Sequence, residues 1–334
     1  MNVAINGFGR IGRAFFRLAD DVGMNIVAIN DLGEKENLEY LLQYDSVYKT
    51  SDEEKRRLLD RFRSATFIQE RDPEKLPWSN MSIDVVVEST GIFASYEKAK
   101  VHLNAGAKRV VVSAPIKDDP AAAGVEGATV LMGVNEERLA TCEISSNASC
   151  TTNAGSPVVA ILDEKIGIEK AMLNTVHGYT STQRTVDGPS KDPRKGRAAA
   201  VNIIPTSTGA AIATTKAHTQ LTDRFDGIAL RVPVPAGSIA DITFLAKRET
   251  SVEEINRVLT EAAGDSRWTG LFAVTSDPLV STDIIGRTEA SIVDLSMTRV
   301  VGGNLVKVLA WYDNEMGYAH TLVRHVMSVG MRLK

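Results

Sequence analysis

Residues 1–31 read MNVAINGFGRIGRAFFRLADDVGMNIVAIND, and this stretch decides the fold. An apolar run at 3–5 leads directly into Gly7, Gly9 and Gly12, which have the spacing G-x-G-x-x-G. A segment with helical spacing follows at 11–18, and a second apolar run at 26–30 ends at Asp31. Strand, glycine turn, helix and strand in this order are typical of the first part of a dinucleotide-binding sheet.

The glycines and Asp31 point to one ligand. Glycine permits a tight turn and a close approach of backbone to a pyrophosphate, which the free N–H groups of the helix N-terminus then bind. Asp31 follows about 20 residues later, where an acid can bond ribose hydroxyls and repel a 2′-phosphate. The alternative is that the glycines and Asp31 form a purely structural turn. The combined pattern favours a dinucleotide site over this alternative, and it favours NAD over NADP as the ligand.

The rest of the chain divides into two patterns. Up to residue 149, apolar runs at 3–5, 25–29, 83–87, 109–112 and 129–132 alternate with helix-like segments at 11–18, 37–42 and 96–103. This alternation predicts an α/β fold with a doubly wound parallel sheet. After Cys150, β-like runs at 229–233, 240–246, 290–294 and 305–311 have fewer helices between them, which predicts a mostly antiparallel sheet in an α+β domain.

Length and composition exclude several classes of protein. A chain of 334 residues exceeds what one core usually organises, so two domains are expected. A net charge of −4 gives no general attraction to nucleic acid or anionic membranes. The absence of a basic leader and of a long apolar segment favours a cytoplasmic location. Two cysteines without clustered histidines predict neither a metal site nor a disulfide framework.

Cys150 is the candidate nucleophile. It lies between a β-like run at 143–146 and an apolar segment at 157–162, so it should begin a helix, where the dipole and free N–H groups stabilise a thiolate. The neighbouring hydroxyls suit helix capping and anion binding alike. A lone cysteine is usually packed in a core, as we expect for Cys142. Beside a nicotinamide site, however, a thiolate could add to an aldehyde, from which a hydride then leaves.

His177 is the candidate base. It ends the apolar run at 171–176 and precedes Gly178, so it should project from the end of a strand. Sequence spacing does not show whether His177 touches Cys150. Surface or packing roles are expected for the other histidines, which are His102, His218, His320 and His325.

Three motifs together resemble the glyceraldehyde-3-phosphate dehydrogenase family, and the resemblance covers essentially the whole chain. They are GFGRIGR at 7–13, ASCTTN at 148–153 and YDNE at 312–315. The resemblance implies NAD-dependent phosphorylating oxidation of glyceraldehyde 3-phosphate, with Cys150 acylated and His177 as its base. Asn314 would hold the nicotinamide carboxamide. The implied cofactor-binding residues are Gly9, Arg10, Ile11, Asp31, Thr90, Asn314 and Tyr318.

The resemblance also implies two phosphate sites. Thr180 and Arg231 match the site for the substrate phosphate, and the site for attacking inorganic phosphate matches Ser149, Thr151, Thr208 and Gly209. An arginine offers a charged fork for phosphate oxygens, although a surface ion pair is the alternative for Arg231. A hydroxyl beside a glycine N–H can bind an anion, although Thr208 could instead cap a helix.

The resemblance further implies a domain division and an assembly. A Rossmann domain of residues 1–149 would be completed by a C-terminal helix at 315–334, with a catalytic domain at 150–314 between them. The family forms homotetramers, in which the Gly- and Pro-containing segment 187–197 would approach the cofactor of a neighbouring copy.

Departures from the family pattern and two rival functions remain. Met316, Ile212 and Thr182 stand where a tryptophan, a lysine and an aspartate are common, and the missing lysine weakens the local positive field.

Erythrose-4-phosphate dehydrogenase, which hydrolyses its thioester, is the nearest rival, and the intact TGAA at 208–211 disfavours it. A catalytically idle dinucleotide-binding protein is the second rival, and it would have been free to lose Cys150 or His177.

Overall fold

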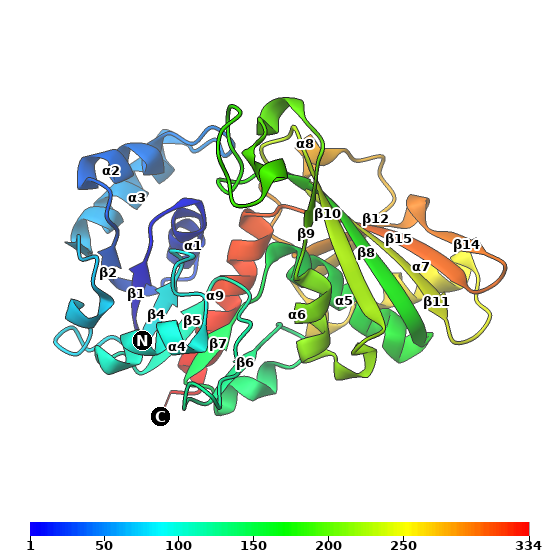
Figure 1. The fold of residues 1–334 in the computed structure, drawn as a ribbon, viewed down its shortest axis with the longest axis horizontal. Coiled ribbons are helices and arrows are strands. Elements are labelled where there is room, and N and C mark those ends of the chain that lie inside the picture. Colours follow the sequence, from blue (N-terminus) through cyan, green and yellow to red (C-terminus); the bar gives the residue numbers. More distant parts are fainter. Residues whose placement is uncertain (334) are drawn as a thin grey trace. The chain divides into compact units, whose positions relative to one another are not determined.

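The computed structural model describes residues 1–333, which form two compact units. The first unit contains Met1–Ala148 and Ala319–Lys334, of which Lys334 lies outside the described residues, and the second contains Ser149–Tyr318 (Figure 1). No helix among residues 1–333 is long and apolar enough to span a bilayer.

The first unit is built on a seven-stranded parallel sheet with the order β3-β2-β1-β4-β5-β7-β6. Its strands are β1 (Asn2–Asn6), β2 (Asn25–Asn30), β3 (Thr66–Ile68), β4 (Val85–Glu88), β5 (Arg109–Val112), β6 (Gly127–Thr129) and β7 (Ile144–Ser146). Its helices are α1 (Arg10–Asp21), α2 (Lys35–Gln43), α3 (Asp52–Ser64), α4 (Tyr96–Asn104) and most of α9 (Met316–Met331). The doubly wound parallel sheet predicted from the sequence is confirmed.

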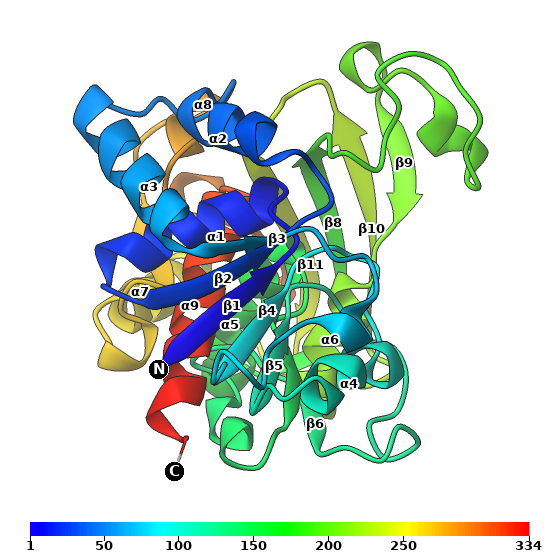
Figure 2. The ribbon, with the colours of Figure 1, turned by 90° about the vertical axis from the view of Figure 1, so that its left-hand side faces the viewer.

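Alternate strand residues of the first unit pack into cores on opposite faces of the sheet, because successive side chains of a strand point to opposite faces. Val3 and Ile5 of β1 join a core with residues of α1, α3 and α9, whereas Ala4 joins a core with Trp78. Figure 2 shows α1 and α4 on opposite sides of the sheet. Both faces are therefore covered, as a parallel sheet requires.

The predicted strand at 129–132 is wrong in most of its length. The observed strand β6 ends at Thr129, and the apolar residues 130–132 continue as buried non-strand backbone. The backbone N–H of Leu131 donates to the side-chain oxygen of Asn135 at 2.8 Å, and Val134 N donates to the Leu131 carbonyl. These local bonds replace the ladder, which an apolar run does not reveal.

The second unit contains a mixed, mostly antiparallel sheet, also as predicted. Its main order is β12-β13-β15-β11-β8-β10-β9, with β14 paired to β15, and only β10–β8 and β12–β13 are parallel among the described pairs. The strands are β8 (Ile168–Gly178), β9 (Ile204–Ser207), β10 (Phe225–Val232), β11 (Ser238–Ala246), β12 (Phe272–Thr275), β13 (Ser291–Asp294), β14 (Arg299–Val301) and β15 (Leu305–Tyr312). The helices are α5 (Cys150–Lys165), α6 (Ala210–Ala217), α7 (Val252–Ala263) and α8 (Ser281–Ile284).

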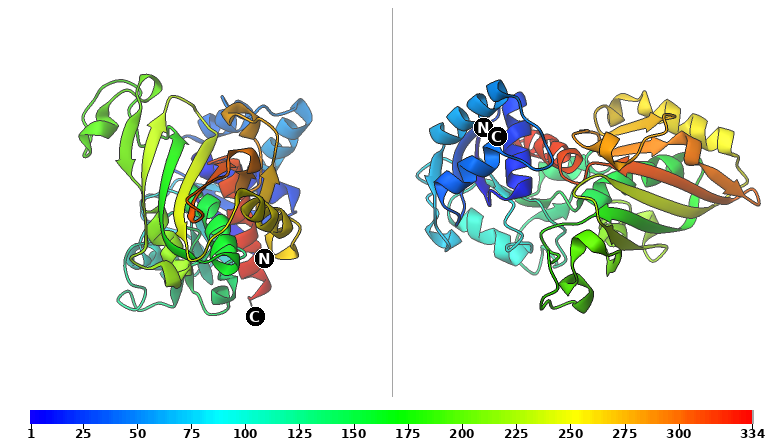
Figure 3. Two further views of the ribbon diagram at one scale, coloured as in Figure 1. Left: turned by 90° about the vertical axis from the view of Figure 1, so that its right-hand side faces the viewer. Right: turned by 90° about the horizontal axis from the view of Figure 1, so that it is seen from above.

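Helices cover one face of this second sheet. Helix α5 packs on strands that include β8, β11 and β15. Helices α5 and α7 lie on the same side of the sheet (Figure 3). Gly155 lets α5 approach closely, since a Cβ there would lie 3.0 Å from Leu173. Along β8 and β10, residues of the other face are exposed, among them Met172 and Ile228. This arrangement directs His177 and Arg231 to the helix-covered face.

Candidate active site

Cys150 is the first residue of α5. Ser149 caps this helix, because its Oγ accepts the N–H of Thr152 at 3.1 Å. The side chain of Asn153 donates to the Ser149 carbonyl at 3.0 Å, which closes the first turn. The sequence therefore placed the thiol correctly at a helix N-terminus, where the macrodipole favours negative charge.

Strand β8 brings His177 to the thiol. The Cys150 Sγ lies 3.3 Å from Nε2 of His177, and the histidine is buried at the end of its strand. The other ring nitrogen, Nδ1, lies 2.6 Å from the carbonyl oxygen of Gly178. Since a carbonyl only accepts, this bond places the hydrogen on Nδ1 and leaves the lone pair of Nε2 facing the sulfur.

Arg231 is held beside this pair by strand register. Parallel pairing of β10 with β8 sets Arg231 directly opposite His177. The guanidinium donates to the Gly178 carbonyl at 3.1 Å and also contacts Nδ1 of His177. An arginine cannot accept, so contact with Nδ1 alone would favour the opposite tautomer. We assign the Nδ1–H form, in which two donors converge on one carbonyl.

The electrostatics favour neutral forms of both groups. Burial lowers the pKa of His177 to about 3, and the charge of Arg231 acts in the same direction. Burial raises the pKa of the Cys150 thiol, which Arg231 and the N–H of Thr151 oppose. The site without ligands thus holds a neutral thiol beside a neutral imidazole, and the 3.3 Å contact supplies the geometry for proton transfer between them.

Tyr312 supports the pair, and sequence reasoning had assigned it no role. Its hydroxyl bridges the hydroxyls of Thr151, at 2.9 Å, and Thr175, at 2.7 Å. Its ring meets the ring of His177 edge-on, with centroids 5.9 Å apart. Tyr312 opens the YDNE motif, so its position was visible in the sequence, but its contacts cross from β15 to β8 and α5.

The remaining candidates of the second unit are held on separate segments. The Thr180 hydroxyl bonds that of Thr182 at 2.8 Å. Thr208 accepts the N–H of Ala210, the first residue of α6, at 3.2 Å, but the N-cap of that helix is Gly209 and no side chain caps it. Both threonines keep hydroxyl groups that an anion could use.

Asn314 and Tyr318 end the second unit. The Oδ1 atom of Asn314 accepts from the Ser238 hydroxyl at 2.9 Å, and Ser238 in turn accepts the N–H of Gly178 at 3.1 Å. This chain fixes the amide with its NH2 group as the remaining donor. Tyr318 is buried in the first turns of α9.

The glycine turn of the first unit has the geometry that a dinucleotide needs. Gly7 has φ +96°, and a Cβ there would lie 2.6 Å from the backbone N of Thr90. A Cβ on Gly12 would lie 2.2 Å from the Gly7 carbonyl oxygen. Gly9 precedes α1, which begins with Arg10 and Ile11 and has no side-chain cap. The helix N-terminus is therefore available to a phosphate.

Asp31 and Arg10 make bonds that the sequence did not show. The Asp31 carboxylate accepts the N–H of Phe8 at 2.7 Å and that of Gly33 at 2.8 Å. It therefore fixes the loop that follows β1 and the loop that follows β2. The Arg10 side chain forks onto Asp45, with N–O distances of 3.2 and 3.3 Å. Asp31 retains lone pairs for ribose hydroxyls, which fits the predicted NAD site.

Two interpretations of other residues meet the structure differently. Cys142 is buried, as predicted, and His102 takes the packing role rather than the surface role of the two that were expected, since it is fully buried within a polar network. Among residues 1–333 there is no group of three or more His, Cys, Asp or Glu side chains that could hold a metal ion.

A dinucleotide-binding unit joined to a unit with a cysteine–histidine pair defines the class of NAD-dependent dehydrogenases that use a thiol. Comparison with known families identifies the particular one. Residues 1–96 match the glyceraldehyde 3-phosphate dehydrogenase NAD binding domain, and residues 149–314 match the C-terminal domain of the same enzyme. The chain therefore belongs to the glyceraldehyde-3-phosphate dehydrogenase family and is an NAD-dependent phosphorylating oxidoreductase.

Individual relatives agree along the full length. The chain is 47% identical over 329 residues to glyceraldehyde-3-phosphate dehydrogenase of Thermotoga maritima, which covers 96% of each chain. It is 43% identical over 341 residues to the Streptomyces coelicolor enzyme, covering 100% of this chain and 99% of the relative. The enzyme of Geobacillus stearothermophilus is 44% identical over 330 residues, covering 97% and 96%.

Proposed function

We propose that this chain oxidises glyceraldehyde 3-phosphate to 1,3-bisphosphoglycerate with Cys150 as the nucleophile and His177 as its base. The observation that carries the assignment is the 3.3 Å separation of the Cys150 sulfur from a histidine nitrogen whose lone pair faces it. This is the hydrogen-bonded pairing that an activated nucleophile requires. Family membership supplies the substrate and the reaction.

The chain's own residues account for the proton steps. His177 takes the proton as the sulfur of Cys150 bonds to the aldehyde carbon, and the hemithioacetal forms on the cysteine. Because His177 holds the thiol proton, the hemithioacetal oxygen is an alkoxide, and it forms the thioester C=O as a hydride leaves the carbon. Inorganic phosphate then attacks the thioester, and the thiolate that leaves recovers its proton from His177. The imidazolium formed on the way is able to polarise the thioester oxygen. NAD, when bound, supplies the hydride acceptor.

The two phosphates would occupy distinct groups of residues. Arg231 and Thr180 would bind the substrate phosphate, since Arg231 brings a charged fork to within contact of the base. Inorganic phosphate would use Ser149, Thr151, Thr208 and Gly209, which include the N-terminal residues of two helices. Hydrolysis of the thioester, as in erythrose-4-phosphate dehydrogenase, would need no such second site.

The cofactor would be held mainly by the first unit. The uncapped start of α1 suits the pyrophosphate, with Gly9, Arg10 and Ile11, while Asp31 suits the ribose and Thr90 follows the adjacent strand. Asn314 has its NH2 group left for the carboxamide, with Tyr318 nearby in sequence. The division into domains at 1–149 with 315–334 and at 150–314 is part of this proposal, and the two compact units support it.

We also infer a homotetramer in the cytoplasm. The uncovered face of the second sheet exposes Met172 and Ile228, and the segment before β9 exposes Val186, Val201 and Ile203. Exposed apolar side chains of this size suit association surfaces, and further copies of the chain are the occupants that the family implies. Two free cysteines, one of them the nucleophile, suit a reducing compartment.

Replacing the nucleophile tests the assignment. Cys150→Ser should lower NADH formation by about 10³-fold or more, because a neutral hydroxyl is a far weaker nucleophile at neutral pH, while the Kd for NAD stays within about twofold. Cys142→Ser is the matched control and should keep its turnover per folded molecule. Comparable turnover in Cys150→Ser would contradict the nucleophile assignment.

A further inference from the structure

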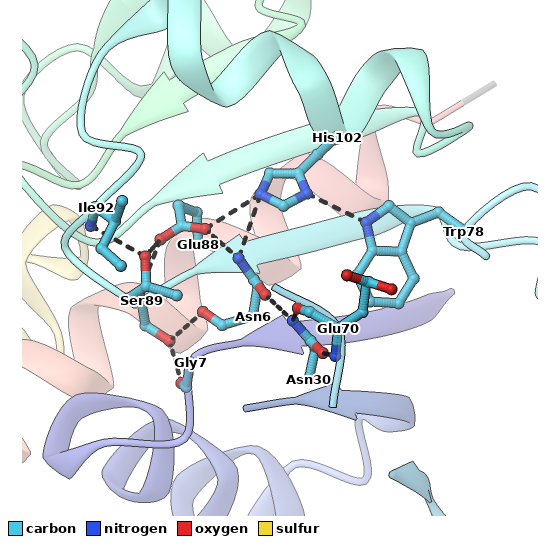
Figure 4. A network of polar contacts seen from close by, with 10 residues as sticks. Asn6, Gly7, Asn30, Glu70, Trp78, Glu88, Ser89, Ile92 and His102 are labelled. Atoms are coloured by element: carbon cyan, nitrogen blue, oxygen red, sulfur yellow. Dashed lines mark hydrogen bonds and ion pairs between the residues drawn. The ribbon is translucent and has the colours of Figure 1, made fainter. Parts of the chain in front are cut away.

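A chain of buried polar side chains crosses the carboxyl ends of three neighbouring strands in the first unit (Figure 4). Asn30 ends β2, Asn6 ends β1 and Glu88 ends β4, and the pairing registers set Asn6 opposite both of the others. Asn30 donates to Asn6 at 2.7 Å, and Asn6 donates to Glu88 at 2.6 Å. His102 of α4 contacts Glu88 from above the sheet at 3.1 Å.

Donor counting fixes the state of His102. The indole N–H of Trp78 donates to Nδ1 of His102 at 3.2 Å, and an indole nitrogen cannot accept. Nδ1 therefore carries no hydrogen, so Nε2 carries it and donates to the Glu88 carboxylate. The hydrogen bond from Trp78 therefore holds the imidazole in the tautomer that donates to Glu88.

Glu88 is the centre of this network. Its Oε2 accepts from Asn6 and His102, and its Oε1 accepts both the N–H and the hydroxyl of Thr90. The carboxylate is 1% exposed and has no Lys or Arg ion-pair partner among the described contacts. A buried charge of this kind is tolerated only when its hydrogen bonds are complete, so each of the four donors matters.

The network sets the position of the loop that faces the glycine turn. With Thr90 fixed on Glu88, the Thr90 hydroxyl accepts the N–H of Ile92 at 3.0 Å. Ser89 donates to the Gly7 carbonyl at 2.7 Å, and Gly7 N donates to the Asn30 carbonyl at 2.8 Å. A shift of Thr90 therefore changes the contact it makes with Gly7, where no Cβ would fit.

We propose that His102 is a positioning residue for the cofactor: through Glu88 it holds the loop of residues 89–92 against the glycine turn, and Trp78 holds His102 in the donating tautomer. The inference rests on the proposed use of Thr90 and the glycine turn by NAD. His102 lies on α4 and acts through Glu88, and its Nε2 also lies 3.5 Å from the side-chain nitrogen of Asn6, which bonds the same carboxylate. Its contribution is to the affinity for NAD, and not to the chemistry at Cys150.

The test compares two substitutions of His102. The amide of Gln reproduces a donor at the position of Nε2, so His102→Gln should bind NAD within about threefold of wild type. His102→Leu removes the donor at similar volume and should raise the Kd for NAD about tenfold, as expected for one lost bond to a charged group. Calorimetric titration with NAD measures both values on the purified full chain.

Three further measurements distinguish a positioning role of His102 from a general destabilisation of the fold. In His102→Leu, kcat at saturating NAD and the rate of Cys150 alkylation by iodoacetamide without NAD should stay within about twofold of wild type. His325→Leu, at another fully buried histidine of the first unit, should leave the Kd for NAD unchanged. If His102→Leu does not fold, Glu88→Gln replaces it, because its amide presents hydrogens to the donors and should weaken NAD binding equally.

The outcomes discriminate clearly. A tenfold loss of NAD affinity in His102→Leu, restored in His102→Gln and absent in His325→Leu, supports the inference. Unchanged affinity in His102→Leu, or equal losses in the Leu and Gln variants, overturns it. Wild-type protein that binds no NAD would contradict the proposed cofactor site itself, and the inference with it.

Discussion

Asp31 illustrates how one side chain serves both fold and specificity. Its two oxygens accept N–H groups from the glycine turn and from its own loop, and its charge lies at the edge where a ribose would bind. Spacing in the sequence predicted the acid, but not that it holds Phe8 and Gly33. Its charge is therefore confined to a fixed position.

Removing this charge should relax the choice of cofactor. In Asp31→Asn, repulsion of a 2′-phosphate disappears and the ribose bonds weaken, so the ratio of kcat/KM for NAD to that for NADP should fall about tenfold or more. Steady-state rates with each cofactor measure it. Asp265→Asn, which alters an exposed capping aspartate of the second unit, is the control. An unchanged ratio in Asp31→Asn would refute a discriminating role.

Single residues also show where sequence reasoning stops. Cys150 could be placed at a helix N-terminus because capping signals are local. The contacts of His177 with Arg231 depend on the register of β10 against β8, between segments 54 residues apart. The bonds of Tyr312 likewise cross three elements. No local pattern encodes such pairings between distant strands. The sequence therefore predicts Cys150, His177 and Arg231 as site residues, but it does not predict the contacts that they make.

At the scale of elements, strands and helices with clear periodicity were predictable and irregular ends were not. The strand Arg109–Val112 agrees with its apolar run, whereas β6 ends early because Asn135 captures a backbone N–H. The helix predicted at 96–103 is α4, but the sequence left open whether His102 lies on the surface or packs inward, and it turns inward toward Glu88.

Helix α9 carries a buried histidine that should make stability depend on pH. His325 contacts Ser145 at 2.7 Å and Asn147 at 3.1 Å, and burial lowers its pKa to about 3. In the unfolded chain its pKa is about 6.5. Between these values the unfolded state binds more protons, so the free energy of unfolding falls as pH falls below about 6.5, by up to ~1.4 kcal/mol per pH unit.

His325→Gln should remove this contribution, since glutamine does not titrate. Urea unfolding at pH 7, 6 and 5 should show a smaller loss of stability for the variant than for wild type over that range. Parallel curves for the two proteins would mean that His325 is not the group responsible.

At the scale of the whole molecule, the exposed face of the second sheet that carries Met172 and Ile228 predicts association between copies of the chain. If copies associate through it, Ile228→Glu should shift the mass measured by light scattering from four chains toward fewer, because a charge would be buried at the contact. Val22→Glu, an exposed apolar site on the first unit, should leave the mass unchanged. A single-chain mass for wild type would contradict the tetramer.

The most direct test of the account is the rate of NADH formation from glyceraldehyde 3-phosphate and NAD, with and without inorganic phosphate in otherwise identical buffer. The account predicts that sustained turnover requires phosphate, because the thioester on Cys150 is released by phosphate and not by water. Equal turnover without phosphate would contradict it, since the thioester would then be hydrolysed as in the rival dehydrogenase.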